Sequence, residues 1–431
     1  MDKWNDTELT RRSFVATTAA GAAIAATPLA LARSVNAQGK DMVRCGVVGC
    51  GGRGTGAAVN AMQASPTTHI VAMADLFPDR LQSSLGHLRD QEDHRSQVAV
   101  TEENTYTGID AYKQLMARDD IDMVILATPP HFRPYHFQEA VRQGHHVFME
   151  KPVAVDPVGV RRVITAAESA DRQGLSVVAG TQRRHQPNYI AAMEQIQNGA
   201  IGDVVMGRCY WNMGGLWSHE PRDDWSPMEW QLRNWLYFTW LSGDHICEQH
   251  IHNLDVVNWA MGGPPVKAVG MGGRQMRTEE RYGHIFDHFA IDLEYPGDRH
   301  AISMCRQTDG CSGRVEEHIH GTRGTLHLHP GRSVIVGESE WTFDGPKPNP
   351  YVQEHLDLVA SIRGEGPRLN EGRRVAESTL TAIMSRMSAY TGQDVTWDQA
   401  MNSQLDLTPA SYEFGDIETP PVPRPGKDQL I

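Results

Sequence analysis

The stretch that most constrains the fold is a short apolar run followed at once by spaced glycines. Residues 43–48 are typical of a buried strand, and residues 55–64, which are rich in alanine, predict a helix. Between them stand Gly49, Gly51 and Gly54 in a G-x-G-x-x-G pattern. The first glycine allows the tight turn, the second admits a pyrophosphate close to the backbone, and the third lets helix pack on strand. Because a helix N-terminus also offers free N–H groups to phosphates, the pattern predicts a dinucleotide-binding unit.

An acidic residue at the end of the next predicted strand makes this interpretation more specific. A glycine-rich turn alone is common in α/β proteins. Here residues 69–74 form a second strand-type run that ends at Asp75, about twenty residues downstream, where the fingerprint places an acid for the ribose hydroxyls. A carboxylate there would repel a 2′-phosphate. The sequence therefore predicts NAD as the cofactor, with NADP the less favoured alternative.

Length and composition exclude several classes of protein. At 431 residues the chain is long for a single domain, and two domains are expected. The net charge of -13 argues against a nucleic-acid partner, because nucleic acids bind clustered lysine and arginine. Six cysteines in a chain of this length do not make a disulfide framework.

Residues 1–38 look like a targeting segment and are set apart from the fold. Residues 10–15 (TRRSFV) resemble a twin-arginine signal, an uncharged alanine-rich stretch follows, and residues 35–37 (VNA) resemble a small-residue cleavage site. We therefore expect export to the periplasm by the twin-arginine route, with no stable membrane insertion after processing. The alternative is an uncleaved membrane anchor, which the alanine-dominated composition and marginal length disfavour.

The rest of the chain divides by pattern into two parts and a tail. In residues 39–185, strand-type and helical runs alternate, which predicts an α/β Rossmann domain with a doubly wound parallel sheet. Residues 186–395 carry strand-type runs, with a hairpin turn at residues 296–298, and end in two helical segments. They predict an α+β domain with an open, mostly antiparallel sheet, whose last helix packs back near the first domain. Residues 396–431 form a C-terminal extension, with its proline-rich end an extended strap or mobile.

Four features in this order resemble one known family. The glycine pattern, Asp75, Thr128-Pro129 and Glu150-Lys151-Pro152 together resemble the glucose–fructose oxidoreductase/inositol dehydrogenase (Gfo/Idh/MocA) family, and the resemblance covers residues 42–395. It implies a Rossmann domain followed by an open sheet whose outer face often mediates assembly, so a homo-oligomer is expected. It also implies an enzyme that oxidises or reduces a sugar or cyclitol carbon with NAD(P).

The motif positions and the resemblance define the expected cofactor contacts. These are Gly49, Gly51, Gly52, Arg53, Gly54, Asp75, Thr128, Pro129, His131, Glu150, Lys151 and Gln182. Lys151 follows a predicted parallel strand, where doubly wound sheets place ligands. Its ammonium group can hydrogen-bond the reacting hydroxyl and favour a developing alkoxide, so we expect it to be catalytic. Glu150 is expected to orient Lys151 or the ribose.

A second constellation, residues 243–255, resembles the family pattern D-x-G-x-H-x-x-D on a helix beneath the substrate. Glu248, His252 and Asp255 take its acid, histidine and final acid positions. Their i, i+4, i+7 spacing would put all three on one helix face. We expect His252 to be the general base or relay and Glu248 to share in catalysis. Glu248 in place of aspartate and His250 in place of glycine depart from the pattern, and leave open how lysine and histidine divide the proton transfer.

Substrate contacts are expected from aromatic and polar groups near that helix. Six of the ten tryptophans lie between residues 211 and 240, and indole rings stack well on sugar faces. The alternative is that most of these rings fill the core or a subunit interface. The expected substrate contacts are Arg183, Trp235, Tyr237 and Asp255, with a structural salt bridge as the other possible role of Arg183.

A catalytic metal is not expected. Glu248, His250, His252, His284 and His288 could be read as ligands. However, His250 and His252 are two residues apart and would point to different sides of a helix, and the tight Cys/His spacing of a structural zinc site is missing from the sequence.

Together these features predict an exported, NAD-dependent oxidoreductase that passes hydride between a ring carbinol of a sugar or glycoside and the nicotinamide. Because an exported enzyme has no free NAD pool, we expect the cofactor to be tightly bound. Two alternatives stay open: an NAD-dependent glycoside hydrolase that uses transient oxidation and elimination, and a non-catalytic sugar-binding protein. Hydrolytic relatives tend to lose the lysine after the glutamate, so Lys151 favours the dehydrogenase. Lys151, Glu248 and His252 together argue against a binding protein.

Overall fold

The first half of the chain forms a six-stranded parallel sheet, as predicted. The computed structural model describes residues 42–429. In sheet order the strands are β3 (Thr105–Thr107), β2 (Thr68–Asp75), β1 (Val43–Val48), β4 (Met123–Leu126), β5 (His146–Met149) and β6 (Val177–Ala179). The strand order reverses beside β1, because β2 and β4 pair with its two edges. Ligands of doubly wound sheets bind at this switch point, outside the carboxyl ends of the strands.

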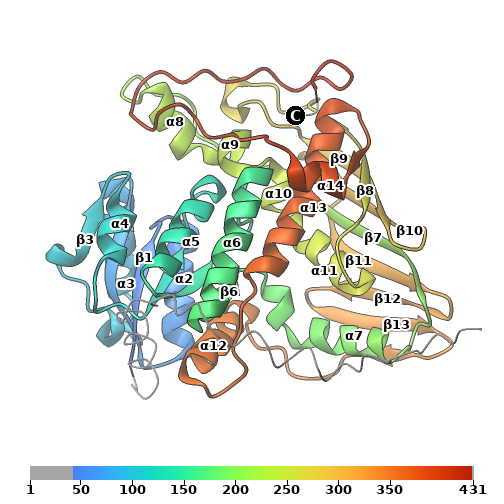
Figure 1. Cartoon of the computed structure of the whole chain (residues 1–431), viewed down its shortest axis with the longest axis horizontal. Helices are drawn as coiled ribbons and strands as arrows, with labels where there is room; N and C mark the ends of the chain where they lie inside the picture. Colours follow the sequence, from blue (N-terminus) through green and yellow to red (C-terminus); the bar gives the residue numbers. More distant parts are fainter. Residues whose placement is uncertain (1–41, 430–431) are drawn as a thin grey trace, which may run out of the picture.

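Helices cover both faces of this sheet (Figure 1). On one face lie α2 (Gly52–Ala64), α3 (Pro78–Arg89) and α12 (Pro350–Arg363), and on the other α4 (Ala111–Met116), α5 (Arg133–Arg142) and α6 (Pro157–Gln173). Since α12 comes from the far end of the sequence, the chain returns to complete the apolar cover of its own first sheet.

The two ends of α6 are capped by neighbouring residues. Asp156 accepts a hydrogen bond from the Gly159 N–H at the start of α6, and Gly174 ends that helix in a left-handed conformation.

The second half forms a nine-stranded, mostly antiparallel sheet, again as predicted. In sheet order its strands are β14 (Trp341–Thr342), β13 (Arg332–Gly337), β12 (Gly324–His329), β11 (Arg314–Gly321), β7 (Val204–Met213), β10 (Arg299–Gln307), β9 (His288–Tyr295), β8 (Lys267–Gly273) and β15 (Val395–Thr396). The β7–β10 pair is parallel and the other pairs are antiparallel. The predicted hairpin is present, since Tyr295 pairs with Arg299.

Two helices join the sheets into one molecule. The inner face of the second sheet is covered by α11 (Ile251–Met261) and α13 (Gly372–Thr391), and α13 also packs along α6 of the first half (Figure 1). Nearly every side chain of α13 is buried, which fits a helix with neighbours on all sides. The remaining helices are α7 (Pro187–Gln197), α8 (Pro227–Arg233), α9 (Thr239–Ser242), α10 (His245–Glu248) and α14 (Trp397–Asn402).

After α14 the chain runs without helix or strand across α8 and α9 (Figure 1). We call residues 403–429 the strap. The Leu407 N–H donates to Asp156 in the first half, and the Gly415 carbonyl accepts from the Met228 N–H in the second half. The strap therefore contacts both halves of the molecule.

The expected signal segment, residues 1–38, lies outside the described residues, so export stays a prediction. Between residues 42 and 429, no helix is long and apolar enough to cross a lipid bilayer.

Candidate active site

A cleft of about 810 Å³ opens at the switch point of the parallel sheet. Its first wall comes from the glycine loop, the residues that follow β2, and the turn after β4. Its second wall comes from the other half of the chain and consists of Trp217, His219, Leu232 and Trp235. The cleft is therefore an inter-domain site, large enough for a cofactor-sized ligand.

The glycine loop has the geometry that close approach of a phosphate requires. Gly49 has φ +95°, and a Cβ there would lie 2.5 Å from the Thr128 nitrogen; a Cβ on Gly54 would lie 1.8 Å from the Gly49 oxygen. By contrast, a Cβ on Gly51 would have Arg80 Nη1, at 3.7 Å, as its nearest neighbour, and one on Gly52 would meet nothing within 4 Å. The loop thus presents bare backbone to the cleft. Among residues 42–429 no side chain caps the start of α2, so its N-terminus suits a pyrophosphate.

Asp75 stands at the end of β2 on the cleft wall. Its two carboxylate oxygens accept the N–H of Cys50 at 2.6 Å and that of Phe77 at 2.8 Å. Burial raises the pKa of Asp75, and these N–H bonds oppose the rise. The guanidinium of Arg80 is close enough to act on Asp75 electrostatically. The carboxylate is thus fixed in place beside the glycine loop, and these residues fit the ribose and diphosphate of a nicotinamide dinucleotide.

The turn after β4 completes this wall. Thr128 and Pro129 line the cleft, and the buried Arg133 holds the turn by donating to the Leu126 carbonyl at 2.7 Å and the Thr128 carbonyl at 2.8 Å. His131, predicted as a cofactor contact, does not line the cleft. It is buried among aromatic rings, and its Nε2 lies 2.7 Å from the Tyr412 hydroxyl of the strap. Burial lowers the pKa of His131 to about 4, so the ring is neutral at neutral pH.

Lys151 and Glu248 meet across the two halves of the chain. Lys151 follows β5, and its Nζ donates to Oε1 of Glu248 at 3.0 Å and to the Glu248 backbone carbonyl. Both side chains are largely buried, with 12% and 15% of their surface exposed. An ammonium group held in this way sits at the carboxyl end of a parallel strand, as predicted.

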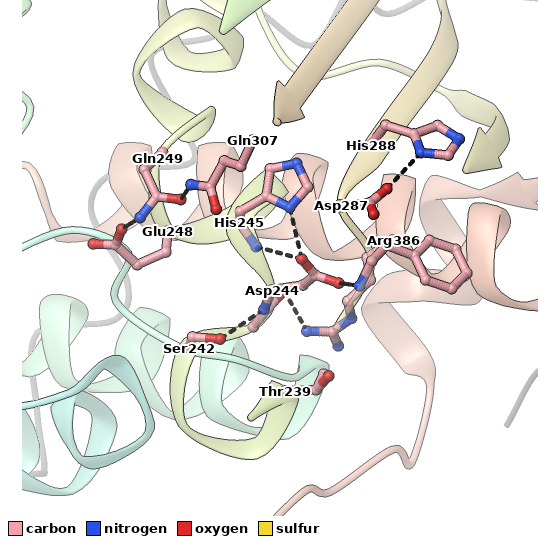
Figure 2. A network of polar contacts seen from close by, with 12 residues as sticks. Thr239, Ser242, Asp244, His245, Glu248, Gln249, Asp287, His288, Gln307 and Arg386 are labelled. Atoms are coloured by element: carbon pink, nitrogen blue, oxygen red, sulfur yellow. Dashed lines mark hydrogen bonds and ion pairs between the residues drawn. The ribbon is translucent and has the colours of Figure 1, made fainter. Parts of the chain in front are cut away.

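Glu248 also ends a hydrogen-bond chain that runs into the second sheet (Figure 2). Gln249 Nε2 donates to Glu248, Gln307 Nε2 donates to Gln249 Oε1 at 2.6 Å, and Arg277 Nη1 donates to Gln307 Oε1 at 2.5 Å. A guanidinium can only donate, so Arg277 fixes the orientation of both amides. Each donor in the chain therefore points toward Glu248, which fixes its carboxylate in the position where it pairs with Lys151.

The predicted single helix face for Glu248, His252 and Asp255 is wrong. The helix is interrupted: α10 ends at Glu248 and α11 begins at Ile251. His252 lies beside the Trp211 ring, with centroids 5.7 Å apart, and its Nδ1 is buried without a hydrogen-bond partner among the described residues. Burial, with the charges of Lys151 and Arg183, holds the pKa of His252 well below its usual value.

Asp255, a predicted substrate contact, forms ion pairs with two arginines. Its carboxylate binds Arg184 at 2.7 Å and Arg374 at 3.0 Å, and the Ser378 hydroxyl donates to it at 2.7 Å. These cations hold the pKa of Asp255 far below its usual range despite its burial. The residue therefore ties α11 to α13, and its contact with a substrate stays a prediction.

Arg183 and Tyr237 are likewise engaged in the interior. Arg183 forms a buried ion pair with Glu317, whose pKa burial raises to about 7, and this is the alternative role that the sequence left open. The Tyr237 ring is buried and its hydroxyl donates to the Trp217 carbonyl at 2.9 Å. Of the predicted substrate contacts, Trp235 lines a cleft, but it lies in the wall that faces Asp75.

Three predicted cofactor contacts are connected through the Tyr351 ring of α12: Glu150, Arg53 and Gln182. Arg53 Nε donates to Glu150 Oε1 at 2.5 Å, and the Arg53 guanidinium lies 5.0 Å from the centre of the Tyr351 ring. Gln182 Nε2 donates to the Tyr351 hydroxyl at 3.2 Å. Arg53 therefore connects Glu150 to Tyr351 of α12. One expectation was that Glu150 orients Lys151, but Glu150 pairs with Arg53 instead.

The histidines considered as metal ligands are dispersed. His250 Nε2 lies 2.7 Å from the Ser303 hydroxyl, and His288 Nδ1 lies 2.8 Å from Asp287. Within residues 42–429, no three His, Cys, Asp or Glu side chains gather in an arrangement that could hold a metal ion.

The fold and the cleft define a dinucleotide-binding α/β protein with a second domain built on a mostly antiparallel sheet. Residues 43–178 match the family described as "Oxidoreductase family, NAD-binding Rossmann fold", and residues 193–396 match "Oxidoreductase family, C-terminal alpha/beta domain". The chain therefore belongs to the Gfo/Idh/MocA oxidoreductase family.

Three known proteins illustrate the similarity. An uncharacterized oxidoreductase of Streptococcus pneumoniae is 28% identical, over 88% of this chain and 92% of its own. Inositol 2-dehydrogenase of Rhizobium meliloti is 24% identical, over 68% of this chain and 78% of its own. The aldose-aldose oxidoreductase of Caulobacter crescentus shares the fold, with a TM-score of 0.65 at 18% identity, over 82% of this chain and 98% of its own.

Several residues of the site were not predicted from the sequence. Arg80 and Phe77 line the cleft beside Asp75, and their position just after the β2 acid was a usable signal. Gln307 and Arg277 gave no signal, because only the pairing of β9 with β10 and the return of loop 274–287 bring them to Glu248.

Proposed function

We propose that this protein is an NAD-dependent oxidoreductase that transfers hydride between a carbinol carbon of a sugar, cyclitol or glycoside and the nicotinamide. The observation that carries the proposal is the Lys151–Glu248 pair at the carboxyl end of β5. This strand pairs with β4, whose following turn lines the cleft together with the glycine loop and Asp75, which fit a dinucleotide. Membership of an oxidoreductase family supports the reaction type.

The residues of the chain would handle the proton while the nicotinamide, when bound, accepts or gives the hydride. The Lys151 ammonium group donates to the substrate oxygen and favours an alkoxide there. Glu248 and its donor chain keep that ammonium in place. His252 is the candidate relay for the proton that the hydroxyl loses, because its Nδ1 is buried without a hydrogen-bond partner among the described residues.

We further propose that the cofactor is NAD and that it stays bound through turnover. Asp75, fixed by two backbone N–H groups, would repel a 2′-phosphate. Export by the twin-arginine route, the reason for expecting a retained cofactor, is part of the same proposal, as is assembly into a homo-oligomer through the outer face of the second sheet.

The test is made on protein purified without added cofactor. Released nucleotide is identified by mass, absorbance near the reduced-nicotinamide band is recorded, and free sugars, inositols and aryl glycosides are then added. Lasting reduction of bound NAD by a free sugar or cyclitol supports the proposal. Net aglycone release without lasting reduction would replace it with NAD-dependent glycoside hydrolysis. No nucleotide, and none taken up on addition, would leave a sugar-binding protein.

A further inference from the structure

The second wall of the cleft faces the end of the site where adenosine belongs. We call Trp217, His219, Leu232 and Trp235 the aromatic wall. It encloses the same cleft as Asp75, Phe77 and Arg80. In Rossmann domains the acid after the second strand binds the ribose that carries adenine. The aromatic wall therefore stands opposite the adenosine half of a dinucleotide, whereas Lys151, Glu248 and His252 are not among the residues that line this cleft.

The ring of Trp217 is exposed on a rigid frame. Trp217 is 44% exposed, which is unusual for so large an apolar side chain, and its ring centroid lies 6.0 Å from that of Trp235. The backbone beneath it is fixed, because the buried Tyr237 hydroxyl donates to the carbonyls of Leu216 and Trp217. The buried Asn234 accepts the His219 N–H at 2.8 Å. An exposed indole on a fixed frame at a cleft is a ready stacking surface for a flat ring.

Ion pairs hold the aromatic wall against the first domain. Arg233, between Leu232 and Trp235, donates from its two terminal nitrogens to the two Asp79 oxygens at 3.1 Å each. Its guanidinium also lies 3.9 Å from the centre of the Phe77 ring. Arg80 Nη2 donates to the Arg233 carbonyl at 3.3 Å. The first-domain residues that make these contacts come just after Asp75: Phe77, Asp79 and Arg80. The aromatic wall is therefore held by the segment next to the acid that would bind the ribose.

The strap supports this arrangement from outside. Phe414 stacks on Phe77 with ring centroids 5.9 Å apart, and Gly415 accepts the N–H of Met228 in α8. The strap thus joins the first domain and the helix that carries Leu232, and an opening of the cleft at this end would break contacts on both sides.

We propose that the aromatic wall binds the adenosine half of the dinucleotide, with Trp217 stacking on adenine, and that this enclosure slows cofactor release. The inference rests on the proposed function and extends it, because it assigns the tryptophan-rich segment to the cofactor and not to the sugar. It gives a physical basis for a cofactor that is retained without a surrounding pool.

The experiment compares two fragments of the cofactor on the full chain. AMP reports the adenosine half and nicotinamide mononucleotide the other half, both by calorimetry, and the NADH dissociation rate is followed by stopped-flow fluorescence. We expect Trp217→Ala to weaken AMP binding and to speed NADH release by on the order of 10-fold, as loss of one base–aromatic stack does. Binding of nicotinamide mononucleotide should not change, and Trp217→Phe should restore most of the loss.

Trp341→Ala, at the distant edge strand β14, is the matched control and should alter none of these values. Unchanged AMP affinity and NADH release in a folded Trp217→Ala variant would overturn the inference. Equal weakening of both fragments would also overturn it, because the wall would then not be specific to adenosine. The proposed function survives either result as long as the wild type binds NADH through Asp75. If the wild type binds neither NADH nor AMP, both proposals fail.

Discussion

The ammonium nitrogen of Lys151 lies 3.0 Å from a carboxylate oxygen of Glu248, although the two residues come from different halves of the chain. Lys151 is placed by β5 of the first sheet, and Glu248 by α10 beneath the second. The pair therefore exists only when the two halves are docked. The helix pair α6–α13 makes this docking extensive and apolar, so the geometry of the pair is built into the resting fold.

Lys151→Ala should abolish most of the activity without preventing cofactor binding. Loss of the ammonium removes the donor to the developing alkoxide, and we expect kcat to fall at least about 100-fold. The measurement is steady-state kinetics beside NADH titration, and the fall in kcat should far exceed any change in Kd. Lys113→Ala, on the exposed side of α4, is the control. Retention of full kcat in the Lys151 variant would exclude this lysine from the reaction.

Gln307→Glu should act on Glu248 through Gln249. A carboxylate at residue 307 still accepts from Arg277 but cannot donate to Gln249, so the Gln249 amide must turn over. Its carbonyl oxygen would then face the Glu248 carboxylate, and this repulsion displaces Glu248 from its position beside Lys151. We expect a lower kcat with little change in NADH affinity.

A purely structural role for residue 307 would lower stability but leave the kcat of the folded protein unchanged. The control for the added charge is Gln63→Glu, on the exposed face of α2. A thermal melt of each variant separates loss of fold from the loss of kcat.

The sequence was most informative where the geometry is local. Gly54 was predictable because a Cβ there collides with the Gly49 carbonyl within the same turn, and Gly49 because its φ of +95° favours glycine. Trp235 was assigned to the sugar because its nearness in sequence to His252 suggested nearness in space. In the structure the Arg233 contacts to the first domain bring that segment to the cleft wall that faces Asp75, and such long-range pairing leaves no periodic signal.

Strand β11 has little strand signal in its sequence, for a related reason. Its partly exposed positions carry Glu316, His318 and His320, so its sequence is typical of a polar loop. The alternate residues Glu317 and Ile319 are buried on the other face of the same strand. Its strand character depends on pairing with β7 and β12, on either side. Tertiary pairing of this kind overrides local propensity.

Asp75→Ser should weaken the preference for NAD over NADP. The change removes the carboxylate that would repel a 2′-phosphate and leaves Arg80, whose guanidinium lies in the cleft, to attract one. We expect NADH affinity to fall and NADPH affinity to rise, so that their ratio changes by on the order of 10-fold or more. Fluorescence titration with the two reduced nucleotides measures the ratio. If the ratio is unchanged, Asp75 does not contact the ribose.

Stability should fall steeply on acidification because several histidines are buried in the neutral form. Burial lowers the pKa of His131, His146 and His284 to about 4 and that of His250 and His355 to about 3. Between pH 6.5 and these values the unfolded chain binds protons that the folded chain does not, so stability decreases as the pH falls. Each such group contributes up to about 1.4 kcal/mol per pH unit. Chemical denaturation from pH 7 to pH 5 should therefore show a falling free energy of unfolding.

At alkaline pH, His185 contributes a loss of folding stability as the pH rises. Burial lowers its pKa, but the hydrogen bonds to Asp357 and Glu371 outweigh burial and raise the pKa to about 10. The stabilisation from this charged ring is complete below its unfolded value near 6.5 and is lost as the pH rises through about 10. His185→Gln should therefore destabilise the protein at pH 7 and flatten the decline of stability between pH 7 and pH 10. An equal slope in wild type and variant would mean that His185 is not charged in the folded protein.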